Sequence, residues 1–130
     1  MLLAMAITHS AVIDKSTDEQ KISYNSSSPD EIALVNAAAF FGCKFIGRDN
    51  LSNTIKVKNE NGGTKVLQLL NLFEFDSDRK RMSVIVKDEN NLIKMYCKGA
   101  DSVMLNLLSR DFTNQKFTNI TKEYLNEYAC

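Results

Sequence analysis

The chain has 130 residues, of which 44% are hydrophobic and 25% are charged, as is typical of one globular domain. Sixteen basic and sixteen acidic side chains cancel, so the net charge attracts neither nucleic acid nor an anionic membrane, and an anion site would need a local cluster. The longest apolar stretches, 1–7 and 32–41, fall short of the roughly 20 residues that span a bilayer. With no convincing signal peptide, we expect a soluble, cytosolic chain.

The N-terminal part of the chain predicts a helix followed by a polar segment. Residues 1–13 show a helical pattern. One face of this expected helix carries Leu2, Met5, Ala6 and His9. The polar residues 14–28 predict a loop or a short edge strand.

A second helix is predicted to begin at Ser28. Ser28 is a suitable N-cap, Pro29 suits the first helical position, and Glu31 stands where a capping box places its carboxylate. The run 32–41 is apolar nearly all round, which predicts a well-buried helix. Gly42 can end it.

Strands dominate the middle of the chain, and helices return at its end. The predicted strands are 44–47, 54–58, 65–75, 82–87 and 93–97. Turn-forming residues lie at 61–63 and 88–91, and the nearly continuous apolar run 82–87 predicts a central strand. Residues 101–108 and 115–128 predict helices. Strands grouped in this way predict an α+β fold, a mostly antiparallel sheet flanked by helices, in one domain over 1–130.

Two aromatic residues precede the densest polar cluster of the chain. Phe73 and Phe75 are two apart on a predicted strand, so both are expected on one face of the sheet. Such a pair usually belongs to the core. Six polar residues, 76–81, follow Phe75 directly, so it lies at the wet end of its strand, where a phenyl ring can stack on a purine.

Cationic side chains offer two candidate anion contacts. Arg79, Lys80 and Arg81 are consecutive, which usually indicates a solvated charge run. On a strand, Lys80 would point opposite its neighbours, so only one side could face a ligand. Lys98 ends a predicted strand and precedes Gly99, which allows close approach of a ligand beside the start of the next helix.

Other kinds of site are not supported. Cys43, Cys97 and Cys130 are isolated, so buried thiols are expected rather than disulfides or a zinc site. His9 is the single histidine and is expected in or beside the core. There is no GxxxxGK or GxGxxG motif, and we predict no catalytic residue and no metal ligand.

Three segments in this order resemble the nucleotide-binding domain of P-type ATPases. They are Ser28-Pro29-Asp30-Glu31, residues 73–84 and Lys98-Gly99-Ala100-Asp101. Asp101 after Lys-Gly-Ala, and Arg81 within Arg-Lys-Arg-Met-Ser, make the chain similar to the phospholipid-transporting (flippase) branch. Residues 14–17 are faintly similar to the family's phosphorylation segment, but its glycine is missing, so Asp14 is not proposed as a nucleophile.

The resemblance implies roles for six residues. It implies that Phe75 stacks on adenine while Phe73 stays in the core. It implies that Lys80 and Ser77 lie near the ribose and phosphates. Lys98 and Gly99 would belong to the adenosine pocket.

Glu31 has two candidate roles at this stage. The resemblance implies that its carboxylate lies close to the adenine amino group, where an acceptor is useful. The alternative is the capping box with Ser28. Its two oxygens could serve both roles.

The resemblance also implies that this chain is part of a larger membrane ATPase. The domain would hold ATP so that the γ-phosphate reaches an aspartate in a phosphorylation domain, where Mg²⁺ is held. Alone it is expected to bind nucleotide without hydrolysing it. Its partners would be the phosphorylation and actuator domains of the same protein, at the cytosolic face of a membrane, and phospholipid only through membrane helices elsewhere. Two alternatives are the equivalent domain of a cation pump and a non-catalytic interaction module that kept the fold.

Overall fold

The computed structural model describes residues 1–14 and 22–128, without the side chains of 112–114. These residues belong to two compact units, Met1–Lys98 and Gly99–Cys130, which are treated separately below. The prediction of a single domain stays a prediction. Within the described residues, no helix combines the length and hydropathy needed to cross a membrane.

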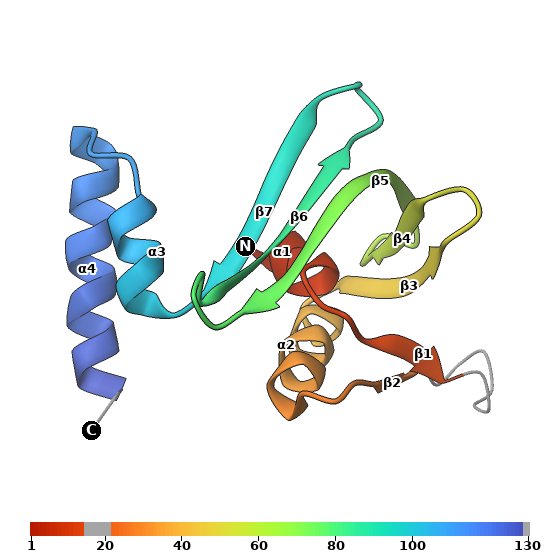
Figure 1. Ribbon diagram of the computed structural model, residues 1–130, viewed down its shortest axis with the longest axis horizontal. Helices are drawn as coiled ribbons and strands as arrows, with labels where there is room; N and C mark the ends of the chain where they lie inside the picture. Colours follow the sequence, from red (N-terminus) through yellow and green to blue (C-terminus); the bar gives the residue numbers. More distant parts are fainter. Residues whose placement is uncertain (15–21, 129–130) are drawn as a thin grey trace. The chain divides into compact units, whose positions relative to one another are not determined.

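The first unit is built on a five-stranded antiparallel sheet (Figure 1). Its helices and short strands are α1 (Leu2–Ile7), β1 (Val12–Asp14), β2 (Ser23–Asn25) and α2 (Pro29–Phe40). The large sheet contains β3 (Cys43–Asp49), β4 (Thr54–Asn59), β5 (Thr64–Asp76), β6 (Arg81–Lys87) and β7 (Ile93–Gly99). The order is β3-β4-β5-β6-β7, and the pairs from β3 to β6 are antiparallel. The predicted α+β class and all five predicted strands are confirmed.

The core lies between this sheet and the two helices. Ala6 and Ile7 of α1 and Val35 and Ala38 of α2 form one buried cluster with side chains from five strands. The strand residues of the cluster are Tyr24, Cys43, Phe45, Ile55, Val57, Leu67, Val84 and Val86. Each fully buried aliphatic side chain contributes roughly 1.5–3 kcal/mol. The predicted central strand is β6, which lies between β5 and β7.

Two predictions about the helices are wrong in part. The first helix ends at Ile7, and residues 12–14 form β1, in which Ile13 pairs with Tyr24 of β2. The hydroxyl of Tyr24 donates to the carbonyl of Phe45 at 2.7 Å, which anchors this small hairpin to the large sheet. The prediction of a loop or a short edge strand over 14–28 agrees with β2, although residues 15–21 lie outside the described part.

The second helix buries one face rather than its whole surface. Val35 and Ala38 are fully buried, whereas Phe40 is 84% exposed, because only one side of α2 belongs to the core cluster. Gly42 follows the helix with a φ of +84°, and a Cβ there would lie 2.8 Å from the Cβ of Glu60. The prediction that Gly42 ends the helix is confirmed.

The second unit contains two helices, α3 (Asp101–Leu107) and α4 (Phe112–Tyr128). Both were predicted, although α4 begins three residues earlier than expected. Apolar side chains of α4, among them Phe117 and Tyr124, are exposed. The rings of Tyr124 and Tyr128 stack at 6.0 Å between centroids.

Candidate functional site

Glu31 begins the site at the N-terminus of α2. The hydroxyl of Ser28 accepts from the backbone N–H of Glu31 at 3.4 Å, as an N-cap does. The reciprocal half of the predicted capping box is absent. The N–H of Ser28 instead donates to the hydroxyl of Ser26 at 3.2 Å. The carboxylate of Glu31 is therefore available for contacts outside its own helix.

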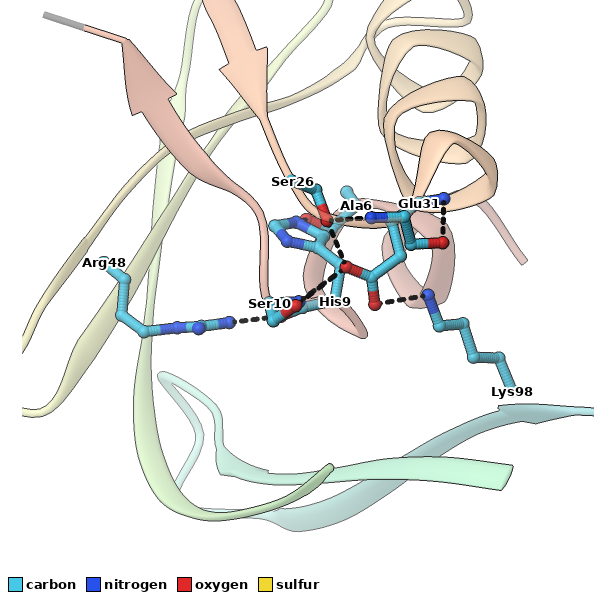
Figure 2. A network of polar contacts seen from close by, with 8 residues as sticks. Ala6, His9, Ser10, Ser26, Glu31, Arg48 and Lys98 are labelled. Atoms are coloured by element: carbon cyan, nitrogen blue, oxygen red, sulfur yellow. Dashed lines mark hydrogen bonds and ion pairs between the residues drawn. The ribbon is translucent and has the colours of Figure 1, made fainter. Parts of the chain in front are cut away.

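Four donors surround this carboxylate, as Figure 2 shows. Its Oε2 accepts from the backbone N–H of Ser10 at 3.2 Å, from the Ser10 hydroxyl at 2.9 Å and from the Ser26 hydroxyl at 2.9 Å. Its Oε1 accepts from the Nζ of Lys98 at 3.2 Å. Glu31 is only 9% exposed. Burial alone would raise the pKa of Glu31, but the hydrogen bonds from Ser10, Ser26 and Lys98 outweigh it and lower that pKa to about 2.

The loop that carries Ser10 is fixed from behind by buried groups. The His9 ring is fully buried and makes a 2.8 Å hydrogen bond to the carbonyl of Ala6. It meets the ring of Phe45 edge-on at 4.6 Å between centroids. Arg48 donates to the carbonyl of His9 at 3.0 Å. Burial lowers the pKa of His9 to about 4, so the ring is neutral at pH 7. His9 is thus a core residue, although it lies beyond α1 rather than on its face.

Lys98 reaches the cluster from the far end of the chain. It is the last residue but one of β7, 67 positions after Glu31. Its side chain is 27% exposed, so its ammonium contacts both the carboxylate and solvent. Gly99 is exposed and closes β7. The structure therefore brings together two of the six predicted site residues, Glu31 and Lys98, in one ion pair.

Phe75 is exposed as the sequence predicts, but Phe73 is not in the core. Phe75 is 64% exposed near the end of β5, but Phe73 is also 41% exposed, so the prediction that Phe73 is in the core is wrong. The register explains this difference. Leu72 pairs with Val84, whose side chain is in the core, whereas Phe73 pairs with Ser83 on the opposite face of the sheet.

A bulge also separates the two aromatic residues. The pairing shifts between Phe73 and Asp76, so one extra residue interrupts the alternation. The expectation that Phe73 and Phe75 share a face therefore loses its basis. Arg79 lies over the Phe73 ring, with 5.4 Å from its Cζ to the centroid, which gives Phe73 a local partner on this face.

The turn from β5 to β6 contains the remaining predicted residues. Asp76 organises it, because its Oδ1 accepts from the N–H groups of Asp78 at 2.8 Å and Arg79 at 3.0 Å. These bonds lower the pKa of Asp76. Lys80 has a φ of +51° and its N–H donates to the Asp76 carbonyl. Lys80 thus lies in the turn, and the predicted strand alternation around it is wrong. Ser77 and Lys80 are both exposed.

The two arginines of the basic triplet have local roles instead. Arg79 donates to the hydroxyl of Ser83 at 3.0 Å, and Arg81 donates to the carbonyl of Arg79 at 3.1 Å. Lys80, between them, is exposed in the turn. The predicted residues therefore form two groups, Glu31 with Lys98 and Phe75 with the turn. The strands that carry Phe75 and Lys98, β5 and β7, are separated by β6.

Sequence reasoning missed Ser10, Ser26 and Arg48. Serines are common in this N-terminal segment, and no local pattern distinguishes these two.

Of the cysteines, Cys43 is buried and Cys97 partly so, and Cys130 lies outside the described residues. Within the described part of the chain, no three His, Cys, Asp or Glu side chains gather to hold a metal ion.

Comparison with known proteins identifies the family. The family described as "P-type ATPase, cytoplasmic domain N" matches residues 1–129. The chain belongs to this family. The resemblance read from the three segments is thereby confirmed, and the antiparallel α+β fold of this N domain agrees with it.

Three relatives show the branch to which this N domain is similar. It is 42% identical over 118 residues to human "Phospholipid-transporting ATPase ID", covering 91% of the chain and 9% of the relative. It is 42% identical over 127 residues to "Phospholipid-transporting ATPase DRS2" of Saccharomyces cerevisiae, covering 98% of the chain and 9% of the relative. It is 38% identical over 128 residues to "Phospholipid-transporting ATPase 10" of Arabidopsis thaliana, covering 96% of the chain and 10% of the relative. The chain thus spans about a tenth of the length of these relatives.

Proposed function

We propose that this N domain holds the adenosine of ATP within a phospholipid-transporting P-type ATPase. The γ-phosphate would then reach an aspartate in a phosphorylation domain of the same protein, and its transfer would be coupled to lipid translocation. The names of the relatives support the transported substrate. One observation carries the nucleotide site: Glu31 and Lys98, from two of the three segments that resemble the family, meet at 3.2 Å.

The side chains of the two groups suit different parts of ATP. The exposed ring of Phe75 offers a face for adenine, and stacking contributes roughly 1–3 kcal/mol. Glu31 supplies an acceptor for the adenine amino group, and Lys98, followed by Gly99, supplies a cation at the adenosine. Lys80 and Ser77 in the exposed turn can follow the ribose and phosphates. This set would recognise the nucleotide, and the groups that transfer its γ-phosphate would belong to the phosphorylation domain.

The rest of the cycle belongs to other parts of the proposed ATPase. Mg²⁺ would accompany the phosphates and be held in the phosphorylation domain. The partners of this N domain would be the phosphorylation and actuator domains, at the cytosolic face of a membrane. Phospholipid would contact only membrane helices outside this chain. One stacked base with one or two charged contacts gives an expected Kd of roughly 0.1–1 mM, about −4 to −5.5 kcal/mol.

A ¹H–¹⁵N NMR titration of this chain with ATP, and with GTP as the control nucleotide, tests the proposal. We expect shifts at residues 75–80 and 98–100 that saturate near the stated Kd and are larger for ATP. Amides of the turn between β3 and β4 report any unspecific effect. An absence of shifts at several millimolar ATP would contradict nucleotide binding by this chain.

A further inference from the structure

The two oxygens of the Glu31 carboxylate have different surroundings. Oε2 accepts three hydrogen bonds, two from Ser10 and one from Ser26, at 2.9 to 3.2 Å. A carboxylate oxygen has two lone-pair sites in its plane, so these donors occupy Oε2 fully. Among the described residues, Oε1 accepts from Lys98 alone. The acceptor capacity that remains therefore lies on Oε1, on the side where the ion pair meets solvent.

Both serines are held by structure outside the site. The carbonyl of His9, next to Ser10, accepts from Arg48 at 3.0 Å, and the His9 ring packs edge-on against the core residue Phe45. The hydroxyl of Ser26 also accepts from the N–H of Ser28, the N-cap of α2, at 3.2 Å. The direction of Oε1 is thus determined by the core and by the helix terminus, rather than by the rotamer preference of a glutamate.

The hydroxyl donors also determine the charge of the group. Ser10 and Ser26 are neutral, so they stabilise the ionised carboxylate without cancelling its charge. Within the described part of the chain, the charged or titratable side chains around it are Lys98 from β7, Arg48 from β3 and His9 from the loop after α1. His9 is neutral at pH 7. An ionised carboxylate accepts hydrogen bonds and cannot donate them.

We propose that Ser10 and Ser26 are positioning residues that fix Glu31 as an acceptor-only group and thereby select adenine over guanine. This inference rests on the proposed function. Adenine carries an amino group at position 6, which can donate to Oε1. Guanine carries a carbonyl oxygen there, which would face a carboxylate oxygen with no proton between them. A site built around such an acceptor rejects the base that leaves it unpaired.

Two serine variants, Ser10→Ala and Ser26→Ala, test the proposal with two readouts. The first readout is the pKa of the Glu31 carboxyl, followed by ¹³C NMR. The second is the ratio of ATP to GTP affinity from NMR titration. In each variant we expect the Glu31 pKa to rise from about 2 toward its ordinary value. We expect the affinity ratio to fall roughly threefold to tenfold, the scale of one lost hydrogen bond.

Two further variants show whether the hydroxyl itself matters. Ser26→Thr keeps a hydroxyl and should restore the affinity ratio to within about twofold of the wild type. Ser52→Ala is the matched control, because it removes a 2.8 Å hydroxyl–carboxylate bond to Asp49 in the exposed turn after β3. It should change neither the pKa of Glu31 nor the ratio. Ser10 is exposed, so Ser10→Ala is expected to fold even where Ser26→Ala does not.

Each combination of results gives a decision. An unchanged affinity ratio in Ser10→Ala and Ser26→Ala overturns selection of the base by the serines. A ratio that falls while the pKa of Glu31 stays unchanged overturns their action through Glu31. Wild-type chain that binds neither nucleotide overturns the proposed function itself, whereas wild type that binds ATP with serine variants of unchanged selectivity overturns this inference alone.

Discussion

The two groups of proposed site residues differ in how firmly their side chains are held in the absence of a ligand. Glu31 is buried and receives hydrogen bonds from three residues, and the loop that carries one of them, Ser10, is tied to the core through His9. Phe75 and Lys80, at the end of β5 and in the turn after it, are exposed. Fixing a mobile side chain on binding costs about 0.5–1.5 kcal/mol. Only the second group has to meet that cost.

This difference suggests a division of labour. A pre-ordered acceptor discriminates between ligands, because it cannot adapt to the wrong one. An exposed aromatic ring and an exposed lysine supply affinity, because stacking and charge attraction tolerate variation in the ligand. We therefore expect changes near Glu31 to alter selectivity, pH response and stability. Changes at Phe75 and Lys80 should alter affinity alone.

The largest expected effect concerns the pH dependence of the buried group. His9 has a folded pKa of about 4, below its ordinary value of 6.5, so the unfolded chain takes up the proton first as the pH falls. The free energy of unfolding should drop by roughly 2–3 kcal/mol between about pH 6.5 and pH 4. Urea unfolding of wild type and His9→Gln across this range measures the drop, and the variant should show a flatter profile.

The Glu31 carboxylate contributes little to the change in the free energy of unfolding between about pH 6.5 and 4.5. The folded pKa of Glu31, about 2, lies below its ordinary value of 4.5, so its stabilising contribution is complete above about pH 4.5 and is lost toward pH 2. His9 is the only histidine of the chain. A wild-type profile that is flat from pH 6.5 to 4.5 would contradict the burial of a neutral His9, and with it the rigid support inferred for Ser10.

The next effect belongs to the exposed group. Phe75→Ala should weaken ATP binding by roughly 1–3 kcal/mol, the value of one stacked base, which removes measurable binding from a millimolar site. The melting temperature should stay unchanged, because the Phe75 ring is 64% exposed. Phe40→Ala is the matched control, since Phe40 is 84% exposed at the end of α2. A large loss of thermal stability in Phe75→Ala would mean that the ring packs in the core.

Lys98→Ala should alter both affinity and selectivity, because Lys98 contacts the Glu31 carboxylate and, in the proposed site, would also contact the ligand. Lys98→Ala should weaken ATP binding by about 1–2 kcal/mol, on the scale of a charge-assisted contact. The control is Lys94→Ala on the same strand, where Lys94 pairs with Asp88 at 2.7 Å. Isothermal titration calorimetry measures the ATP affinity of both variants and of the wild type. Equal affinities for Lys98→Ala and wild type would remove Lys98 from the site.

Much of the fold could be predicted from the sequence because its signals are local. The strands from 44–47 to 93–97 follow alternation and turn residues, and Ser28, Pro29 and Gly42 mark the ends of α2. The errors arose where tertiary packing decides. Residues 12–14 prefer a partner in β2 to a longer first helix, and α2 buries only the face that meets the core.

The candidate site divides in the same way. The three segments that carry Glu31, Phe75 and Lys98 are recognisable in the sequence, but their contacts depend on register. A bulge after Phe73 cancels the alternation argument for Phe75. Ser10 and Ser26 meet Glu31 from 21 and 5 positions away, through a loop and a hairpin end that no local pattern predicts.

The smallest expected effect is that of Lys80 on ATP binding, and its dependence on salt distinguishes the exposed group from the buried one. Lys80 is exposed in a turn, so Lys80→Gln should weaken ATP binding by less than about 1 kcal/mol. Added salt should remove this difference, because exposed charges are screened beyond roughly 8 Å at physiological ionic strength and within shorter distances as salt rises. Lys98 pairs with Glu31, which is 9% exposed, so the effect of Lys98→Ala should persist. Titrations at about 0.05 and 0.5 M salt, with Lys58→Gln on β4 as the exposed control, measure both. If the two lysines respond equally to salt, they lie in equivalent environments, and the distinction between a pre-ordered and an exposed half of the site is wrong.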